Sequence, residues 1–378
     1  MKMERLKTPC YVIDEDRLER NLKQLRSIMD ATGCKILLAQ KAFSAYALYP
    51  KIGLYLNGTT ASGLYEAKLG REEMGTALEN HVFAAAYREE DFEEIAAICD
   101  HIVFNSFCQL EKFRDQALKH GAGIGLRINP ECSTQDGHAI YDPCAPGSRL
   151  GITCEHFRGK SLDGVEGLHF HTLCEQNADA LETTLGAVEE KFGEYLERSQ
   201  IKWLNFGGGH HITRTGYDIE RLKRCICRMQ DKYQVQVYLE PGEAVALDAG
   251  YLLTQVLDVV ENGGQQTAIL DTSAACHMPD VIEMPYRPPL QNSGRPGEKK
   301  YSYRLAGPTC LAGDIIGEYS FDYQLEPGSR LCFEDMAIYS MVKNNTFNGM
   351  PLPAIVLKRG ADCQSWKTFG YEDFKRHL

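Results

Sequence analysis

The sequence predicts an α/β protein in which a (β/α)8 TIM-like barrel is followed by a mainly antiparallel β domain. Over the first two thirds of the chain, short apolar runs alternate with amphipathic helical runs, as in parallel β/α folds. This alternation stops near Ala246 and gives way to β-rich runs separated by turns. The 378 residues also accommodate a barrel of roughly 250 residues with an appended domain of roughly 120. We therefore expect the barrel over residues 8–246 and the β domain over 247–378, with residues 1–7 joining the β domain.

The barrel elements follow from hydrophobic periodicity. The first helix is expected over residues 14–31, where Leu18, Leu22 and Leu25 fall on one face. Eight short apolar strands are expected at residues 35–39, 59–61, 82–84, 101–104, 125–128, 167–170, 203–206 and 235–239. Helical patterns lie between them at residues 64–71, 91–98, 109–120, 178–196 and 218–233. Strands of the second domain are expected at residues 254–260, 267–270, 301–305, 330–333 and 354–357.

Composition narrows the possible partners and the compartment. The net charge of −11 disfavours nucleic acid, whose phosphates attract basic proteins. The most apolar stretch, residues 244–260, contains Asp248 and Asp258, so no membrane span is expected. The first ten residues lack the apolar core of a secretion signal. The fourteen cysteines form no C-x-x-C pair, which fits core thiols in a reducing cytoplasm better than zinc ligands.

Several polar residues directly follow predicted barrel strands, which is where barrel enzymes carry their active sites. Lys41 follows the strand at 35–39; it could bond to a carbonyl cofactor, although a surface lysine would look the same. The run Gly207, Gly208 and Gly209 could approach a phosphate, but a tight turn explains it equally well. Glu240 could pair with a protonated ring nitrogen or remain a solvated turn residue.

Histidine and cysteine residues add two further candidates. His169 and His171 lie two residues apart on one face of a strand, but no convincing further ligands accompany them, so no metal site is predicted. Cys310 lies in the Gly-Pro-Thr-Cys loop of the second domain. Such a loop favours exposure of the thiol more than a core position does, but from the loop alone a buried or idle thiol remains the better interpretation.

Taken in order along the chain, these motifs resemble the fold type III pyridoxal-phosphate decarboxylases. This alanine-racemase-like barrel family includes ornithine, arginine and diaminopimelate decarboxylases. The matching pieces run from Lys41 to Asn348 and therefore cover most of the chain. The resemblance implies pyridoxal 5′-phosphate as the cofactor and a homodimer with shared active sites. It also implies a small-molecule substrate.

The resemblance assigns a role to each matching residue. It implies that Lys41 bonds to the cofactor and that His171 stacks on the cofactor ring. Glu240 would contact the pyridine nitrogen, while Tyr339 and the three glycines would hold the phosphate. Cys310 of the neighbouring subunit would protonate the α-carbon after CO₂ has left. The predicted catalytic residues are therefore Lys41, His171 and Cys310.

Departures from the family pattern indicate the substrate. Leu311 follows the loop cysteine where ornithine and diaminopimelate enzymes carry an acidic residue. Glu243 stands where the family often has arginine, and the histidine segment reads HTLCE instead of a Gly/Ser-rich form. These changes resemble the branch that acts on the carboxylated polyamines carboxyspermidine and carboxynorspermidine. Because buried amines need paired carboxylates, Glu243 and Asp280 are the main candidates for substrate binding, with Asp314 and Phe347 completing the expected set.

Other functions remain open from the sequence. The chain could decarboxylate a shorter basic amino acid such as ornithine, arginine or diaminopimelate, although Leu311 argues against this. A metal-dependent barrel hydrolase using His169 and His171, or a pyridoxal-phosphate carrier without activity, are weaker alternatives. Carboxyspermidine and carboxynorspermidine differ by one methylene, which an apolar pocket discriminates by only about 1–3 kcal/mol. The sequence does not choose between them.

Overall fold

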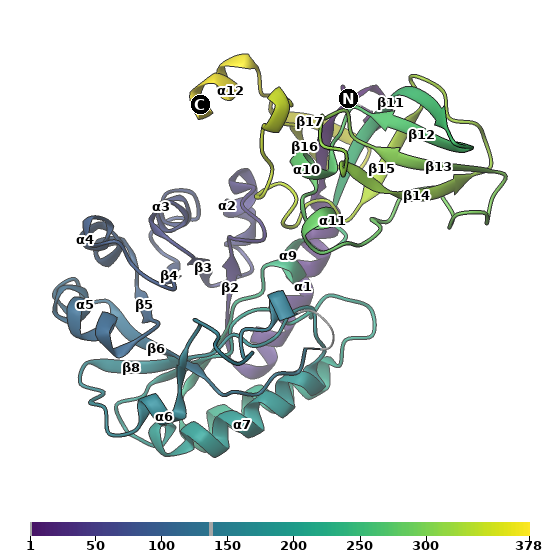
Figure 1. Cartoon of the computed structure of the whole chain (residues 1–378). Helices are drawn as coiled ribbons and strands as arrows, with labels where there is room; N and C mark the ends of the chain where they lie inside the picture. The colour runs from purple at the N-terminus through teal and green to yellow at the C-terminus, as the bar shows by residue number, and fades with distance from the viewer. Residues whose placement is uncertain (1, 136–138) are drawn as a thin grey trace. The chain divides into compact units, whose positions relative to one another are not determined.

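A computed structural model describes residues 2–135 and 139–378 of the chain (Figure 1). The chain forms two compact units. The barrel unit comprises Asn21–Val245, and the sheet unit comprises Met1–Arg20 together with Ala246–Leu378.

Eight parallel strands close the barrel. They are hydrogen-bonded in the order β5, β4, β3, β2, β10, β9, β8, β6, and pairing of β5 with β6 closes the ring. The strands are β2 (Lys35–Ala39), β3 (Gly58–Ala61), β4 (Glu79–Phe83), β5 (His101–Phe104), β6 (Gly123–Asn129), β8 (Val165–His169), β9 (Trp203–Asn205) and β10 (Gln236–Leu239). A two-residue strand, β7 (Ile152–Thr153), pairs with β6 outside this ring. The predicted barrel is confirmed, and each of its eight strands lies where the apolar runs indicated.

Amphipathic helices connect the strands. They are α2 (Tyr49–Ile52), α3 (Leu64–Glu73), α4 (Glu89–Ile98), α5 (Phe107–Lys119), α6 (Cys154–Phe157), α7 (Ala178–Leu196), α8 (Ile219–Tyr233) and α9 (Glu243–Ala246), with short 3-10 turns at Tyr46–Leu48 and Ala139–Tyr141. The first helix, α1 (Glu15–Thr32), buries Leu18, Leu22 and Leu25 completely, as helical spacing predicted. It begins one residue later than expected because the Asp14 carboxylate caps it, accepting from the N–H groups of Asp16 and Arg17.

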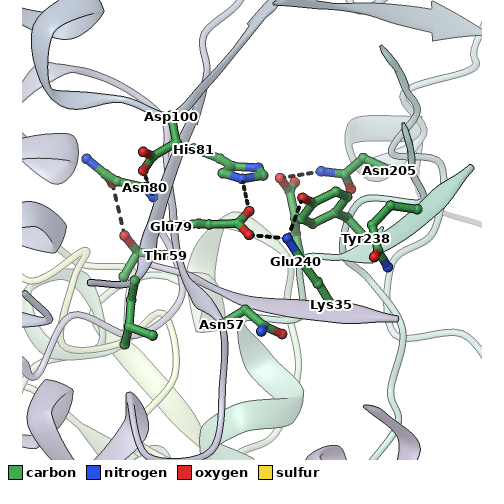
Figure 2. Close-up of polar contacts among 12 residues, drawn as sticks. Lys35, Asn57, Thr59, Glu79, Asn80, His81, Asp100, Asn205, Tyr238 and Glu240 are labelled. Atoms are coloured by element: carbon green, nitrogen blue, oxygen red, sulfur yellow. Dashed lines mark hydrogen bonds and ion pairs between the residues drawn. The ribbon is translucent and has the colours of Figure 1, made fainter. Parts of the chain in front are cut away.

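A polar cluster lies inside the barrel near the amino ends of the strands. The Glu79 carboxylate bonds the Lys35 ammonium on one side and His81 Nε2, at 2.8 Å, on the other (Figure 2). Lys35 Nζ also lies 3.2 Å from the Tyr238 hydroxyl. Burial would raise the pKa of Glu79, but the hydrogen bonds from His81 and Lys35 outweigh it and lower that pKa to about 2. The cluster is therefore a paired ionic centre at neutral pH.

The sheet unit is built on one eight-stranded, mainly antiparallel sheet, as predicted. Its strand order is β14, β13, β12, β11, β1, β16, β17, with β15 also pairing with β11. The strands are β1 (Cys10–Asp14), β11 (Gly250–Asn262), β12 (Gln265–Leu270), β13 (Tyr301–Ala306), β14 (Ile315–Phe321), β15 (Arg330–Glu334), β16 (Ala354–Arg359) and β17 (Asp362–Lys367). Short helical segments are Met3–Arg5, α10 (Ala274–His277), α11 (Asp280–Glu283), Phe347–Gly349 and α12 (Tyr371–His377).

The first strand of the chain differs from the prediction. β1 pairs antiparallel with β11 and parallel with β16, so residues 8–20 belong to the sheet unit, whereas they were expected in the barrel. All five residues of β1 are buried, because the strand is central in its sheet and has neighbours on both edges. Its sequence Cys-Tyr-Val-Ile-Asp lacks the polar alternation of a half-exposed strand, which explains why the pattern was missed.

The described residues also show the lengths of the helices and the state of the cysteines. None of the helices in residues 2–135 and 139–378 is both long enough and apolar enough to cross a lipid bilayer. None of the fourteen cysteines, all of which lie in the described part of the chain, is in a disulfide bond, and seven of them are buried. Cys310 is one of the two exposed cysteines, and the other is Cys108.

Candidate active site

The predicted barrel residues converge because their strands are neighbours. Lys41, Glu240, Gly207 and His171 follow β2, β10, β9 and β8, which are adjacent in the ring. Backbone hydrogen bonds hold the strand ends together: Ala39 N–H donates to the Pro241 carbonyl at 3.1 Å, and Glu240 N–H donates to the Gly207 carbonyl at 2.8 Å. These residues therefore share the carboxyl-terminal rim of the barrel, where barrel enzymes act.

Lys41 lies in an environment that disfavours its positive charge. Its side chain is accessible to water and yet has many protein atoms around it. Burial and the nearby Arg127 guanidinium lower the pKa of Lys41, and Glu240 acts in the opposite sense. A lysine with a lowered pKa has a larger fraction of neutral, nucleophilic amine.

Arg127 on β6 is a site residue that sequence reasoning missed. It is only 5% exposed, its guanidinium carbon lies 4.5 Å from the centre of the Phe83 ring, and its Nη2 donates to the His171 carbonyl at 3.0 Å. Burial lowers the pKa of Arg127 to about 10, so it remains a cation at neutral pH. The available signal was a single arginine within the otherwise apolar strand Gly-Ile-Gly-Leu-Arg-Ile-Asn.

The imidazole of His171 is fixed and neutral. Its Nδ1 accepts a 2.8 Å hydrogen bond from the N–H of Gly208, so Nδ1 carries no proton. Burial, together with the charges of Lys41 and Arg127, holds the pKa of His171 well below its usual range. A flat, uncharged ring tethered in this way suits stacking against a planar ligand.

The three glycines form a turn that packs against the segment after β8. A Cβ on Gly207, whose φ is 70°, would lie 2.4 Å from the Phe170 carbonyl oxygen. A Cβ on Gly209, whose φ is 80°, would lie 1.8 Å from the Leu173 carbonyl oxygen. Both positions therefore require glycine. The N–H groups of Gly207 and Gly208 are used within the barrel, by Asn205 and His171, so the predicted contact with phosphate stays a prediction.

Glu240 is a buried carboxylate with partners on both oxygens. It is 7% exposed; Oε2 lies 3.2 Å from His169 Nε2, and Oε1 accepts from Asn205 Nδ2 at 2.8 Å (Figure 2 shows the Asn205 contact). Burial would raise the pKa of Glu240, but the hydrogen bonds that it accepts, first from His169 and then from Asn205, lower that pKa to about 2. Glu240 is therefore a buried carboxylate that is ionised at neutral pH.

Glu243 lies beside a second carboxylate. Its Oε1 is 3.8 Å from His211 Nε2, and the polar atoms of Glu175, His211 and Glu243 all fall within 4.8 Å of one another. Glu175 was not predicted as a site residue, although the HTLCE segment that contains it had been noted as a departure. Two carboxylates this close favour a cationic group between or beside them.

The predicted residues of the sheet unit divide into two groups. In the first, the N–H of Cys310 donates to Asn348 Oδ1 at 2.9 Å, which joins its loop to the turn that carries the exposed Phe347. Asp314, 2% exposed, accepts from the Thr309 hydroxyl at 2.7 Å and holds the same loop in shape. This bonding favours a loop-holding role for Asp314 over the predicted contact with substrate.

The second group contains Asp280 and Tyr339. Asp280 Oδ1 is 2.5 Å from Lys343 Nζ, and the same ammonium also contacts Glu283. The negative charge of Asp280 is thus already paired. Tyr339 has a positive φ of 53°, and its carbonyl accepts from the N–H of Lys343 at 2.9 Å. Both residues belong to the sheet unit, and the contacts described for them are with other residues of that unit. The predicted contact of Tyr339 with phosphate and that of Asp280 with substrate therefore stay predictions.

The two histidines considered for a metal have other hydrogen-bond partners. Across the part of the chain that the structure describes, the sets of three metal-binding side chains close enough to share an ion are Glu79, His81 and His101, and Glu175, His211 and Glu243. Neither set contains His169 or His171. Those two rings instead bond Glu240 and the Gly208 N–H, which removes the geometric basis for a hydrolase built on them.

Comparisons with known proteins agree with this arrangement. A family model described as "Pyridoxal-dependent decarboxylase, C-terminal sheet domain" matches residues 10–337. A carboxynorspermidine/carboxyspermidine decarboxylase of Campylobacter jejuni is 45% identical over 386 residues, covering 99% of both chains. A carboxyaminopropylagmatine decarboxylase of Synechocystis is 41% identical, covering 100% of this chain and 97% of the relative.

Solved structures agree in fold. A crystal structure of carboxynorspermidine decarboxylase from Campylobacter jejuni, complexed with norspermidine, superposes with a TM-score of 0.91 at 42% identity, covering 99% of this chain and 100% of that one. Diaminopimelate decarboxylase from Helicobacter pylori shares the fold with a TM-score of 0.82 at 17% identity, covering 99% and 97% of the two chains. The chain therefore belongs to the pyridoxal-phosphate-dependent decarboxylases, in the branch that includes the carboxynorspermidine/carboxyspermidine decarboxylases.

Proposed function

We propose that the protein decarboxylates carboxyspermidine or carboxynorspermidine to spermidine or norspermidine and CO₂, as a step of polyamine biosynthesis. One observation carries this proposal. Lys41, His171 and Glu240 converge at adjoining strand ends, in a chain that aligns over its full length with a decarboxylase named for these substrates.

The barrel residues fit pyridoxal 5′-phosphate. The Lys41 amine has the lowered pKa that covalent attachment to an aldehyde requires, and the Glu240 anion suits a protonated ring nitrogen. The neutral, tethered His171 ring suits stacking on a planar heterocycle. When bound, the cofactor supplies an electron-accepting ring that takes up the electron pair released as the α-carboxylate leaves as CO₂.

The chain's own residues then have separate tasks. Lys41 attaches the cofactor and yields its place to the substrate's α-amine. Glu240 keeps a proton on the ring nitrogen, and His171 holds the ring plane. Cys310, contributed by the partner subunit of a homodimer, transfers its thiol proton to the α-carbon after the C–C bond has broken. Tyr339 and the turn at Gly207–Gly209 hold the phosphate, which is the role that their motifs imply in the family.

The substrate's remaining amines are cationic and need carboxylates. Glu243 is the better of the two predicted candidates, because Glu175 lies beside it, whereas Asp280 is paired with Lys343. We propose that Glu243 and Glu175 together bind an amine of the polyamine chain. The same pair would also accept the guanidinium of carboxyaminopropylagmatine, the substrate in the name of the Synechocystis relative, so that compound is a second candidate.

Cysteines that form no disulfide in the described residues are compatible with a cytoplasmic enzyme, which is the location we propose. The function is tested by measuring CO₂ release from carboxyspermidine with and without added pyridoxal 5′-phosphate. We expect cofactor-dependent release and none from Lys41→Ala. A protein that binds the cofactor but releases no CO₂ would be a carrier, and a colourless protein that holds stoichiometric zinc would indicate a metal-dependent enzyme.

A further inference from the structure

We propose that His169 is a positioning residue for the reaction: through a neutral Nε2–H group it fixes the Glu240 carboxylate in one orientation and keeps it ionised. The inference rests on the proposed function, because it takes Glu240 as the partner of the cofactor's ring nitrogen. It deepens that function by naming the group on which the charge of Glu240 depends.

The tautomer of His169 follows from its contacts. Its Nε2 lies 3.2 Å from Glu240 Oε2, and an ionised carboxylate can only accept, so Nε2 carries the proton. Its Nδ1 is buried and has no hydrogen-bond partner among the described residues. A second proton on Nδ1 would therefore be buried without an acceptor, which is costly. His169 is a neutral donor.

Burial of the ring favours the same neutral state of His169. Burial lowers the pKa of His169, and the neighbouring cations Arg127 and Lys41 lower it further, against the raising effect of Glu240. Neutrality of this ring matters for chemistry. A neutral donor stabilises the carboxylate without cancelling its charge, whereas an imidazolium would form an ion pair and reduce the charge available to the ring nitrogen.

The strand register holds His169 in place. Arg127 on β6, His169 on β8 and Asn205 on β9 are direct neighbours across three adjacent parallel strands, so their side chains point to the same side of the sheet. The His169 ring stacks on Phe83, with ring centres 5.5 Å apart and planes 22° apart. This ring is 1% exposed and has little freedom to turn away from Glu240.

Asn205 holds the other oxygen of the same carboxylate. Its Oδ1 accepts from the Gly207 N–H at 2.8 Å, which orients the amide so that Nδ2 donates to Glu240 Oε1 at 2.8 Å. Both oxygens of Glu240 are thus fixed by donors that carry no net charge. Asn205 bonds both Glu240 and the glycine turn, so its replacement would disturb two contacts. His169 bonds Glu240 but not the glycine turn, so its replacement tests the contact with Glu240 separately.

The test compares His169→Phe with His169→Gln in the enzyme loaded with pyridoxal 5′-phosphate. Phenylalanine keeps a ring against Phe83 but removes the donor, while glutamine retains an amide N–H. We measure the absorbance spectrum of the bound cofactor across pH, and kcat and KM for carboxyspermidine. For His169→Phe we expect kcat to fall about tenfold or more while KM changes less than about twofold. On the acid side, the midpoint pH at which the spectrum and kcat change should move up by about one unit, because Glu240 loses a hydrogen-bond donor.

Glutamine at this position should restore most of kcat and return the transition toward that of the wild type. The matched control is His120→Gln, a surface histidine whose Nε2 lies 2.8 Å from Glu93 Oε1; it should leave spectrum and kinetics unchanged. Wild-type-like spectra and pH profiles in His169→Phe would overturn the inference. If His169→Phe does not fold, a His169→Gln enzyme that folds but has lost the wild-type pH profile would overturn it equally. A wild-type protein without cofactor-dependent CO₂ release would instead contradict the proposed function.

Discussion

Burial and neighbouring charges, more than residue type alone, set the chemistry of Lys41 and Glu240. The lysine loses part of its preference for the charged form because it is surrounded by protein and lies near Arg127. The glutamate keeps its charge although it is buried, because His169 and Asn205 donate to it. A pair of groups shifted in this way suits a site that holds an aldehyde at one end and a ring nitrogen at the other.

Replacing Lys41 by alanine should abolish covalent attachment of the cofactor. We expect the visible absorbance band of the bound cofactor to disappear and kcat to fall by at least about a thousandfold. Absorbance after gel filtration and CO₂ release provide the two measurements. The control is Lys202→Ala. Lys202 lies on the surface of the barrel unit, where it forms an ion pair with the exposed Glu166. An unaltered cofactor band in Lys41→Ala would mean that another lysine carries the cofactor.

Replacing Glu240 by glutamine should lower kcat with little change in the fold. The pKa of Glu240 is about 2, so at neutral pH the substitution removes a full negative charge. Loss of one preorganised charge of this kind costs about a hundredfold or more in kcat. Steady-state kinetics and the cofactor spectrum measure the effect. A kcat within twofold of wild type would exclude Glu240 as the partner of the ring nitrogen.

The effect on KM distinguishes the two carboxylates predicted to bind substrate, Glu243 and Asp280. Glu243→Gln should raise KM for carboxyspermidine by an amount worth about 1–3 kcal/mol, because a charged hydrogen-bond acceptor is lost. Asp280→Asn should raise KM less, since Lys343 already pairs with that carboxylate. Steady-state assays on both variants decide. Unchanged KM in both would reject carboxylate recognition at these positions.

The strands of the barrel could be predicted from the sequence, whereas the way in which they bring side chains together could not. Alternation of apolar strands and amphipathic helices is a local pattern, and it located all eight barrel strands. Lys41, Glu240 and His171 could be assigned because each directly follows its own strand and matches a family motif. Arg127 and Asn205 escaped notice because their importance depends on which strands become neighbours, and no local pattern contains that information.

Strand β1 illustrates the same limit for a whole element. Its pairing partners, β11 and β16, lie more than 200 residues away along the chain. A short, continuously buried strand has no two-residue period, so only its long-range pairing reveals it. The domain boundary at the amino end was misplaced for this reason.

The ionic cluster at the amino ends of β2 and β4 makes stability depend on pH. The pKa of Glu79 is about 2 in the folded chain and near 4.5 when unfolded, so its contribution is present above pH 4.5 and is lost as pH falls toward 2. Glu79→Gln should therefore reduce the free energy of unfolding by about 2 kcal/mol at pH 7, with a shrinking difference at lower pH. Urea unfolding between pH 3 and pH 8 measures this.

The control for that prediction is Glu93→Gln. Glu93 also has a pKa of about 2, owing to Gln116 and His120, but it lies on the surface, where solvent screens its interactions. Its replacement should change stability much less. If the two substitutions lower the free energy of unfolding equally, burial of the Lys35–Glu79 pair adds nothing to stability.

At the scale of the whole molecule, the proposal requires two chains for each active site. The Lys41→Ala homodimer should have low activity because it does not attach the cofactor. The Cys310→Ala homodimer should have low activity because it lacks the proton donor. If Cys310 acts in the partner's site, equal mixing after subunit exchange should restore about one quarter of wild-type activity, because half the dimers are mixed and each has one intact site. Size measurement in solution accompanies the assay. A strictly monomeric protein, or no restoration after proven exchange, would contradict the shared site.

The central claim is that this barrel decarboxylates a carboxylated polyamine. The most direct test is the ratio of kcat/KM values for CO₂ release from carboxyspermidine, carboxynorspermidine, carboxyaminopropylagmatine, ornithine, arginine and diaminopimelate, measured with one cofactor-loaded preparation. We predict that carboxyspermidine or carboxynorspermidine exceeds the three shorter amino acids by at least about a hundredfold. Those amino acids carry a single distal cationic group on a shorter chain, whereas the carboxylated polyamines place both a secondary and a terminal amine within reach of Glu243 and Glu175. Equal or faster release of CO₂ from ornithine, arginine or diaminopimelate would contradict it.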